Sequence, residues 1–173
     1  MNKKKRTILT AVLILVISFI AYKFIDSGVF VVDREGINKI YDDVAFDSIV
    51  DGDTAYFIIN GQKTKCRFLA VDTPELDEKE AYAEEAKDFS EDVLKKAKTI
   101  RLLTDAKSDE YDKYGRLLVW VYADNKLLQS ELVDNGLAEV KYVYDDYKYA
   151  DELYKIEEKA KANKVGIWSL NQE

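Results

Sequence analysis

The sequence contains no histidine, one proline and one cysteine among its 173 residues. Without histidine, a Ser-His-Asp or Cys-His catalytic system is excluded, and so is a transition-metal site with histidine ligands. The single cysteine, Cys66, cannot form a disulfide within the chain, and a zinc ribbon would need several more. We expect Cys66 to be a small, half-buried apolar residue. Any acid–base chemistry must therefore come from carboxylates, lysines or tyrosines.

The length and hydrophobic content indicate a single globular domain with an additional terminal segment. A compact domain of roughly 100–150 residues fits this chain length. The hydrophobic fraction of 47% supplies enough apolar surface for a core. This composition argues against disorder for most of the chain.

Charge is distributed unevenly along the chain. Residues 1–28 contain five basic and one acidic side chain, a net charge of +4, whereas residues 29–173 contain 21 basic and 32 acidic ones, a net charge of −11. An acidic domain argues against general nucleic-acid binding, because affinity for phosphate normally comes from a basic face. The average charge still permits a small local site of the opposite sign.

The N-terminal segment has the pattern of a membrane anchor or a signal peptide. The basic segment Met1–Arg6 precedes a run of 15 uncharged residues, Ile8–Tyr22. A signal-peptide core has about 7–15 apolar residues and a membrane-spanning helix about 17–25, and no A-x-A cleavage site follows the run. We expect residues 1–28 to be an uncleaved signal anchor, residues 29–43 a linker and the rest to lie outside the cytoplasm. The alternatives are secretion after cleavage and a buried core helix.

The pattern of the remaining chain predicts an α+β fold that is mainly β. Alternating apolar residues and the hairpin signal Asn60-Gly61 predict three strands, and spacing near 3.6 residues predicts a long amphipathic helix after them. The expected strands are 44–50, 55–59, 63–71, 99–104 and 117–122; the expected helices are 78–98, 128–135 and 150–163, with 140–144 extended. This order suits a five-stranded Greek-key barrel of the OB type with about three helices over residues 44–170, preceded by the N-terminal hydrophobic helix. A ferredoxin-like sandwich is the alternative, but it would place a helix after the first strand.

Three carboxylates occur in two loops that end strands. Asp53 belongs to the segment Asp51–Thr54, while Asp72 and Glu75 belong to Asp72–Glu75. Taken separately, each segment is ordinary turn or helix-start chemistry. Together they offer hard oxygen ligands suited to Ca²⁺ or Mg²⁺.

Two arginines complement these carboxylates. Strand alternation places Arg67 on the same face as Leu69 and Val71, where a guanidinium needs an anionic partner. Arg116 stands at the entrance of the predicted strand 117–122. A structural ion pair would explain each arginine alone. A divalent cation with a spare carboxylate and two bidentate donors is suited to phosphoryl transfer.

At these residues the sequence resembles the staphylococcal nuclease (thermonuclease) family. The matching segments occur in family order across roughly residues 40–170, and they are Val50–Thr54, Arg67–Glu75, Asp112–Arg116, Gly136–Tyr144 and Gly166–Ser169. The resemblance implies an OB barrel and a monomeric, Ca²⁺-dependent phosphodiesterase. Such an enzyme cleaves DNA and RNA and leaves 3′-phosphate and 5′-hydroxyl ends.

The resemblance also implies a role for each matching residue. Asp53, Asp72 and the backbone carbonyl of Thr73 would bind Ca²⁺. Glu75 would be the general base, and Arg67 and Arg116 would hold the phosphate and stabilise the transition state. Residues that would contact the neighbouring phosphate and the base are Lys113, Tyr114, Tyr142 and Tyr144. The alternating Tyr142-Val143-Tyr144 also fits a half-buried strand.

One segment departs from the family pattern. Leu76–Ala81 is short and largely acidic, where the best-known members have a longer, lysine-rich loop beside the substrate. Every catalytic position is filled, so we expect a membrane-associated extracytoplasmic endonuclease with weak affinity for its substrate. The alternatives are a non-catalytic OB-fold module that binds nucleic acid or protein at the cell surface, and a calcium-stabilised structural domain.

Overall fold

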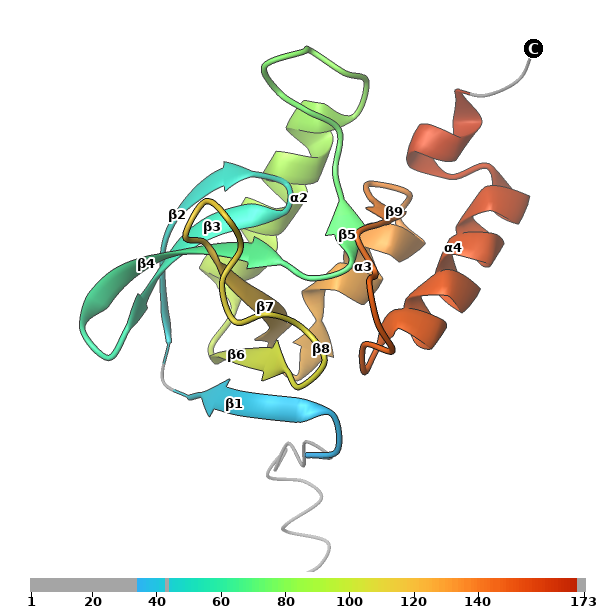
Figure 1. The fold of residues 1–173 in the computed structure, drawn as a ribbon. Helices are drawn as coiled ribbons and strands as arrows, with labels where there is room; N and C mark the ends of the chain where they lie inside the picture. Colours follow the sequence, from blue (N-terminus) through green and yellow to red (C-terminus); the bar gives the residue numbers. More distant parts are fainter. Residues whose placement is uncertain (1–33, 43, 171–173) are drawn as a thin grey trace, which may run out of the picture. The chain divides into compact units, whose positions relative to one another are not determined.

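The computed structural model describes residues 34–42 and 44–170, which form a mixed β-sheet accompanied by helices (Figure 1). The strands are β1 (Ile37–Tyr41), β2 (Ala45–Asp51), β3 (Thr54–Ile59), β4 (Gln62–Phe68), β5 (Val71–Asp72), β6 (Ile100–Asp105), β7 (Leu117–Ala123), β8 (Lys126–Leu127) and β9 (Glu139–Val140). The helices are α2 (Ala83–Lys96), α3 (Leu128–Asp134) and α4 (Ala150–Asn163), followed by the short 3₁₀-helix η1 (Gly166–Ser169). This architecture confirms the predicted α+β class.

The predicted anchor, residues 1–28, lies outside the described residues, as does the hydrophobic helix expected there. Among the described helices, none has the length and apolar character needed to cross a membrane.

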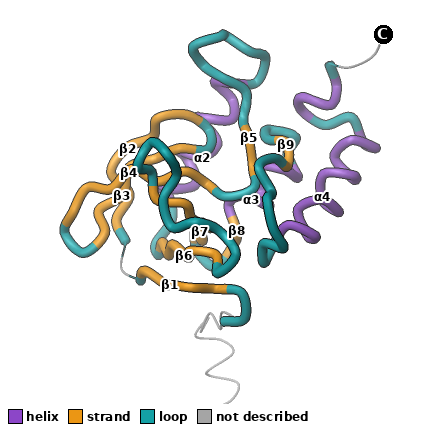
Figure 2. The backbone as a smooth tube through the Cα atoms, viewed as in Figure 1, coloured by secondary structure: helices purple, strands orange, loops and turns teal. Residues whose placement is uncertain are grey.

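The main sheet has the strand order β1-β6-β7-β4-β3-β2, with β8 paired to β7 (Figure 2). All of these pairs are antiparallel except β4 with β7, which is parallel. The two ends of this order, β1 and β2, are consecutive in the chain. This strand order is consistent with the predicted barrel of the OB type.

Strand β1 corrects the prediction for residues 29–43. Residues 37–41, expected to belong to a weakly structured linker, pair with β6 in the register Ile37 to Asp105 and Tyr41 to Leu102. With β1 and the two-residue β8, the main sheet of the described residues has seven strands rather than the expected five. Strand β1 forms one edge of this sheet, beside β6.

The core lies between the sheet and the helices. The largest side chains with almost no exposed surface come from β3, β4, β6, β7, α2, α3 and α4, and include Phe57, Phe68, Trp120, Leu132 and Leu153. Helix α2 packs against β2, while α3 packs against β7 and α4. Buried Gln129 of α3 accepts from the Val121 amide and donates to the Val119 carbonyl, which fixes α3 to the backbone of β7.

Three element boundaries differ from the prediction because of left-handed residues. Ala70 has a φ of 60°, so the expected strand 63–71 divides into β4 and β5. Tyr82 has a φ of 69°, so α2 begins at Ala83 rather than near residue 78. Tyr142 has a φ of 59°, and the extended segment expected over 140–144 ends at Val140.

Candidate functional site

The Asp53 loop is held in place by close packing against α2 and Thr73. The Ser90 hydroxyl donates a buried hydrogen bond of 2.6 Å to the Gly52 carbonyl. A Cβ atom at Gly52 would lie 2.7 Å from Thr73 Cγ2 and 2.8 Å from Ala86 Cβ, so the backbone approaches more closely than any other residue would allow. This packing brings the β2–β3 turn next to the chain that follows β5.

Asp53 is a buried carboxylate with its hydrogen-bonding capacity filled locally. It accepts from the Thr54 hydroxyl at 3.0 Å and from the Thr73 amide at 2.9 Å. Its side chain retains only 6% of its surface. Burial raises the pKa of Asp53 to about 7, although the neighbouring charge of Arg67 opposes the shift. This buried carboxylate therefore needs a neighbouring positive charge to remain ionised.

Arg67 supplies that cation and bridges the two loops. Its Nη2 atom lies 3.0 Å from Asp53 Oδ2 and 2.9 Å from Asp72 Oδ1. Its Nη1 atom donates to the carbonyls of Phe68 and Val71 at 2.8 and 2.7 Å. The predicted anionic partner of Arg67 is thus confirmed, and it consists of two carboxylates.

Two of the predicted metal ligands, Asp53 and Asp72, pair with the same side chain, Arg67. The Asp53 and Asp72 carboxylates both lie within 3.0 Å of one nitrogen atom, so their oxygens converge on a single positively charged point. Thr73, the third predicted ligand, is adjacent through its amide contact with Asp53. Within the described residues, no three His, Cys, Asp or Glu side chains are arranged to hold a metal ion. The side-chain donors are therefore two carboxylates.

Glu75 stands apart from the buried ion pairs and lies at the junction of two clefts. It is exposed, and its amide donates to Glu80 Oε2 at 2.7 Å. Partial burial and the charges of Asp51 and Asp72 raise the pKa of Glu75. One cleft of about 600 Å³ is lined by Glu75, Asp72 and Lys141, and the other, of about 660 Å³, by Glu75, Arg67 and Arg116.

Arg116 is oriented by the loop that precedes β7. Asp112 Oδ1 accepts from the amides of Tyr114 and Arg116, both at 2.9 Å, and Asp112 Oδ2 accepts from Arg116 Nε at 2.6 Å. Partial burial opposes ionisation of Asp112, but these hydrogen bonds outweigh it and lower the pKa of Asp112. The Arg116 side chain keeps 26% of its surface and lines the larger cleft. Arg116 therefore forms an ion pair, as expected of a structural residue, and also lines the cleft, as expected of a phosphate-binding residue.

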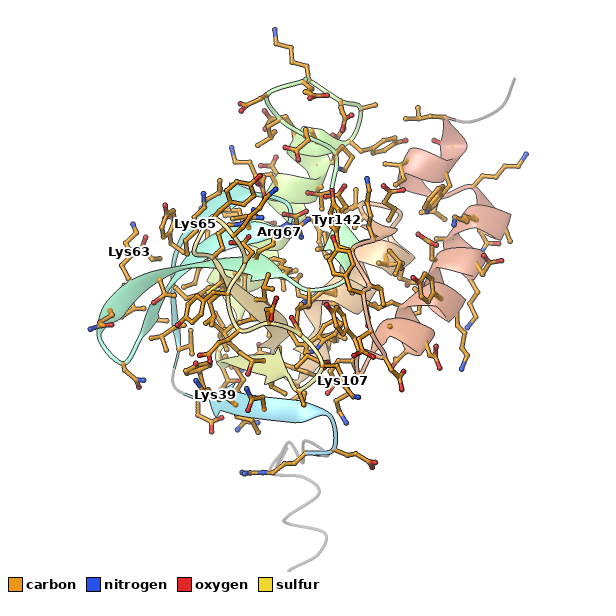
Figure 3. All side chains as sticks on the ribbon, in the orientation of Figure 1. Lys39, Lys63, Lys65, Arg67, Lys107 and Tyr142 are labelled. Atoms are coloured by element: carbon orange, nitrogen blue, oxygen red, sulfur yellow. The ribbon has the colours of Figure 1, made fainter. Side chains whose placement is uncertain are left out.

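The four remaining predicted residues also line the larger cleft. Lys113 and the exposed rings of Tyr114, Tyr142 and Tyr144 contribute to its wall. The exposed fractions of Tyr142 and Tyr144 are 48% and 80%, and neither belongs to a strand, which excludes the half-buried strand as their explanation. Arg67 Cζ lies 5.8 Å from the centre of the Tyr142 ring (Figure 3).

Three residues of the clefts were not identified from the sequence. Tyr111, which is 52% exposed, and Tyr147 line the larger cleft. Lys141 lines the smaller one and contacts Asp72 Oδ2 at 2.9 Å and Glu139 Oε1 at 2.7 Å. Tyr111 directly precedes the matching family segment Asp112–Arg116, and Lys141 lies within the segment Gly136–Tyr144. These positions are the only indication in the sequence that the two residues belong to the site.

Comparison with known proteins places this site in a family. Residues 65–170 match the family model described as "Staphylococcal nuclease homologue". Over 125 residues the chain is 33% identical to the thermonuclease of Staphylococcus hyicus, covering 70% of this chain and 72% of that protein. The chain belongs to the staphylococcal nuclease family. The resemblance inferred from the sequence motifs is confirmed.

Two proteins of Bacillus subtilis (strain 168) are more similar in sequence to this chain but are longer than it. The chain is 42% identical over 134 residues to the SPbeta prophage-derived endonuclease YokF, covering 75% of this chain and 45% of that protein. It is 42% identical over 131 residues to endonuclease YncB, covering 73% of this chain and 61% of that protein. The chain therefore spans about half the length of these two relatives.

Proposed function

We propose that this protein is a metal-dependent nuclease that hydrolyses phosphodiester bonds of nucleic acids. The observation that carries the proposal is the convergence of Arg67, Arg116 and Glu75 on one cleft, beside the paired carboxylates Asp53 and Asp72. Thermonuclease and endonuclease are the names of its relatives in the same family. The arrangement combines anion-binding groups with a carboxylate that is not locked in a buried ion pair.

The arginines bind and polarise the phosphate. Arg67 is fixed by four contacts that engage both of its terminal nitrogens, so its guanidinium is oriented before substrate arrives and its Nε–H remains as the donor to a phosphate oxygen. Arg116 is fixed through Nε, and its two terminal nitrogens remain available to bind phosphate oxygens or the departing 5′ oxygen. Preorganised donors of this kind stabilise charge that develops in the transition state without a reorganisation cost.

Glu75 removes a proton from the attacking water. Its carboxylate is exposed to the larger cleft, and its raised pKa makes it a stronger base than an ordinary glutamate. Lys113 and Tyr114 contact the next phosphate, while Tyr142 and Tyr144 flank the base. Stacking on aromatic rings tolerates any base, which suits a nuclease without strict sequence preference.

Asp53, Asp72 and the Thr73 carbonyl would hold a divalent cation. When bound, this ion supplies Lewis-acid stabilisation of the phosphoryl oxygens. Carboxylate and carbonyl oxygens suit Ca²⁺, which extracellular sites bind at about 10⁻⁴–10⁻³ M. We assign Ca²⁺ as the cofactor, DNA and RNA as substrates, and 3′-phosphate and 5′-hydroxyl ends as products.

We also propose that the protein acts as a monomer outside the cytoplasm, tethered to the membrane by residues 1–28. The basic residues before the hydrophobic run support this orientation. Secretion after cleavage is the alternative. Protease added to intact cells should digest the domain on the cell surface, and labelling of the N-terminus distinguishes a retained anchor from a cleaved signal.

The activity is tested with the full-length chain, plasmid DNA and single-stranded DNA and RNA, with Ca²⁺ or with a chelator. We expect Ca²⁺-dependent cleavage, and a loss of at least about 100-fold for Glu75→Gln and for Arg116→Ala. Glu78→Gln, in the exposed loop that follows, should cleave at the wild-type rate. Absence of metal-dependent cleavage between pH 7 and 10 would refute the enzymatic function, and binding without turnover would favour a nucleic-acid-binding module.

A further inference from the structure

One face of β4 carries cations at alternate positions, from exposed Lys63 to buried Arg67. Lys63, Lys65 and Arg67 follow one another along this strand, and the residues between them, Thr64 and Cys66, point to the other face. Figure 3 shows the three side chains in sequence across the viewed face, with Tyr142 beyond Arg67. In a domain with a net charge of −11, such a row is a local reversal of sign.

Tyr56 of β3 lies beside these lysines. The register pairs Tyr56 with Lys65, and the Lys63 and Lys65 Nζ atoms lie 4.7 and 5.8 Å from the centre of the Tyr56 ring. The Tyr56 side chain is half-buried, so part of its surface is exposed beside the two lysines. We call Tyr56, Lys63 and Lys65 the β4 stripe.

The lysines of the β4 stripe are available to an anion. Within the described residues, their only ion pair is the contact of 2.5 Å between Lys63 and Asp47, in which both side chains are partly exposed. Exposed pairs of this kind contribute about 0–1 kcal/mol. A phosphate can therefore replace Asp47 at little cost.

The spacing of the stripe matches a nucleic-acid backbone. Side chains two residues apart on one strand are separated by about 6.6 Å, which is close to the distance between successive phosphates of an extended single strand. A strand whose scissile phosphate lies at Arg67 would place its next phosphates over Lys65 and Lys63. Tyr56 would then offer a ring for a sugar or base.

We propose that the β4 stripe binds single-stranded nucleic acid. The bound part of the substrate extends from the scissile phosphate along β4, away from the larger cleft. The proposal rests on the proposed nuclease function, because Arg67 connects the stripe to the cleft. It also identifies a source of cations in a chain whose loop 76–81 is largely acidic and contains one lysine, Lys79. The stripe extends the substrate site from one or two nucleotides to several.

The test measures binding of a thymidylate dinucleotide and an octanucleotide to the full-length chain by fluorescence anisotropy, in EDTA to prevent hydrolysis. Lys63→Gln/Lys65→Gln is compared with Lys155→Gln/Lys159→Gln, which removes two exposed lysines of α4 that line neither cleft. We expect the wild type to bind the octanucleotide more tightly than the dinucleotide, and the stripe variant to lose about tenfold for the octanucleotide alone. Its slope of log K against log salt should fall by about 1.4, since each phosphate contact contributes about 0.7.

Two further results decide the proposal. Tyr56→Leu should weaken octanucleotide binding about fivefold without changing the salt slope, because stacking involves no counterion release. Equal affinity of the wild type for both lengths, or equal losses in the stripe and α4 variants, would overturn the proposal. A chain that binds through the stripe but never cleaves would instead refute the nuclease function and leave the stripe intact.

Discussion

Arg67 has a structural role as well as the proposed catalytic one. It forms ion pairs with Asp53 and Asp72, and it donates to two carbonyls at the break between β4 and β5. A buried carboxylate left without its partner costs much more than a solvent-exposed one. The same side chain therefore stabilises the fold around the cleft in addition to its proposed contact with phosphate.

We expect Arg67→Met and Arg116→Met to separate stability from activity. Arg67→Met should lower the free energy of unfolding by about 3–5 kcal/mol, because Asp53 remains buried and unpaired. Arg116→Met should lower it by no more than about 1 kcal/mol, since its pair with Asp112 is partly exposed. Both should lose nuclease activity. Urea unfolding measures the difference, and equal losses of stability would contradict the structural role of Arg67.

Residue types and strand alternation indicated the carboxylates and the two arginines of this site, whereas Thr73, Lys113 and the tyrosines followed from the family resemblance. The partner of Arg67 followed from the cost of burying a guanidinium in an apolar strand. Lys63 and Lys65 have the same period of two, but exposed lysines are common, so this pattern alone does not indicate a site. Tyr111 and Lys141 have no signal beyond their position beside or within a matching family segment, since their places in the clefts depend on the folding of distant segments.

Among the elements, local patterns predicted those strands and helices whose stabilising contacts are near in sequence. The hairpin at Asn60-Gly61 is one case, since both residues have the positive φ that the turn requires. Strand β1 was missed because its pairing partner β6 lies more than 60 residues away. The breaks at Ala70, Tyr82 and Tyr142 were missed because these residue types rarely adopt positive φ.

The junction between α3 and η1 depends on close contact between the backbones of two glycines, Gly136 and Gly166. A Cβ at Gly136 would lie 2.2 Å from the Val165 carbonyl oxygen, and one at Gly166 would lie 2.1 Å from the Gly136 oxygen. The Ile167 amide donates to that same Gly136 oxygen at 2.9 Å. The ends of α3 and α4 can meet only if both positions lack a side chain.

Gly136→Ala should therefore destabilise the protein much more than Gly61→Ala. Both glycines have positive φ, but a Cβ at Gly61 meets nothing within 4 Å. The backbone strain alone should cost about 1–2 kcal/mol at either site. Gly136→Ala adds a clash with backbone that cannot move aside, so its loss in urea should exceed the Gly61→Ala loss by at least about 1 kcal/mol. Similar losses in the free energy of unfolding would show that the backbone at the contact between Gly136 and Gly166 moves to accommodate the added Cβ.

For the molecule as a whole, acidity limits binding strength without excluding the chemistry. The net charge of −11 over residues 29–173 repels a polyanion at a distance. Within the clefts and the β4 stripe, however, cations stand where phosphates would lie. Long-range repulsion and short-range attraction respond differently to salt, because screening acts over about 10 Å at 0.1 M ionic strength.

The same repulsion should act on the fold. A large net charge of one sign destabilises a compact domain, and added salt relieves this repulsion. Asp88 of α2 lies at helical spacing from four other acidic residues of α2, namely Glu84, Glu85, Glu91 and Asp92. Like charges at this spacing are destabilising. This helix face is therefore the place where screening should have a measurable effect.

We expect the thermal midpoint of the wild type to rise by a few degrees between roughly 10 and 150 mM NaCl, while its affinity for DNA falls. Asp88→Lys should raise the midpoint at low salt and reduce its further rise with salt, because it removes repulsion that the ions would otherwise screen. Calorimetry over this salt range measures both effects, with sucrose as a control for non-ionic stabilisation. A wild-type midpoint that stays constant or falls would mean that local ion pairs, rather than net charge, determine the electrostatic stability of the domain.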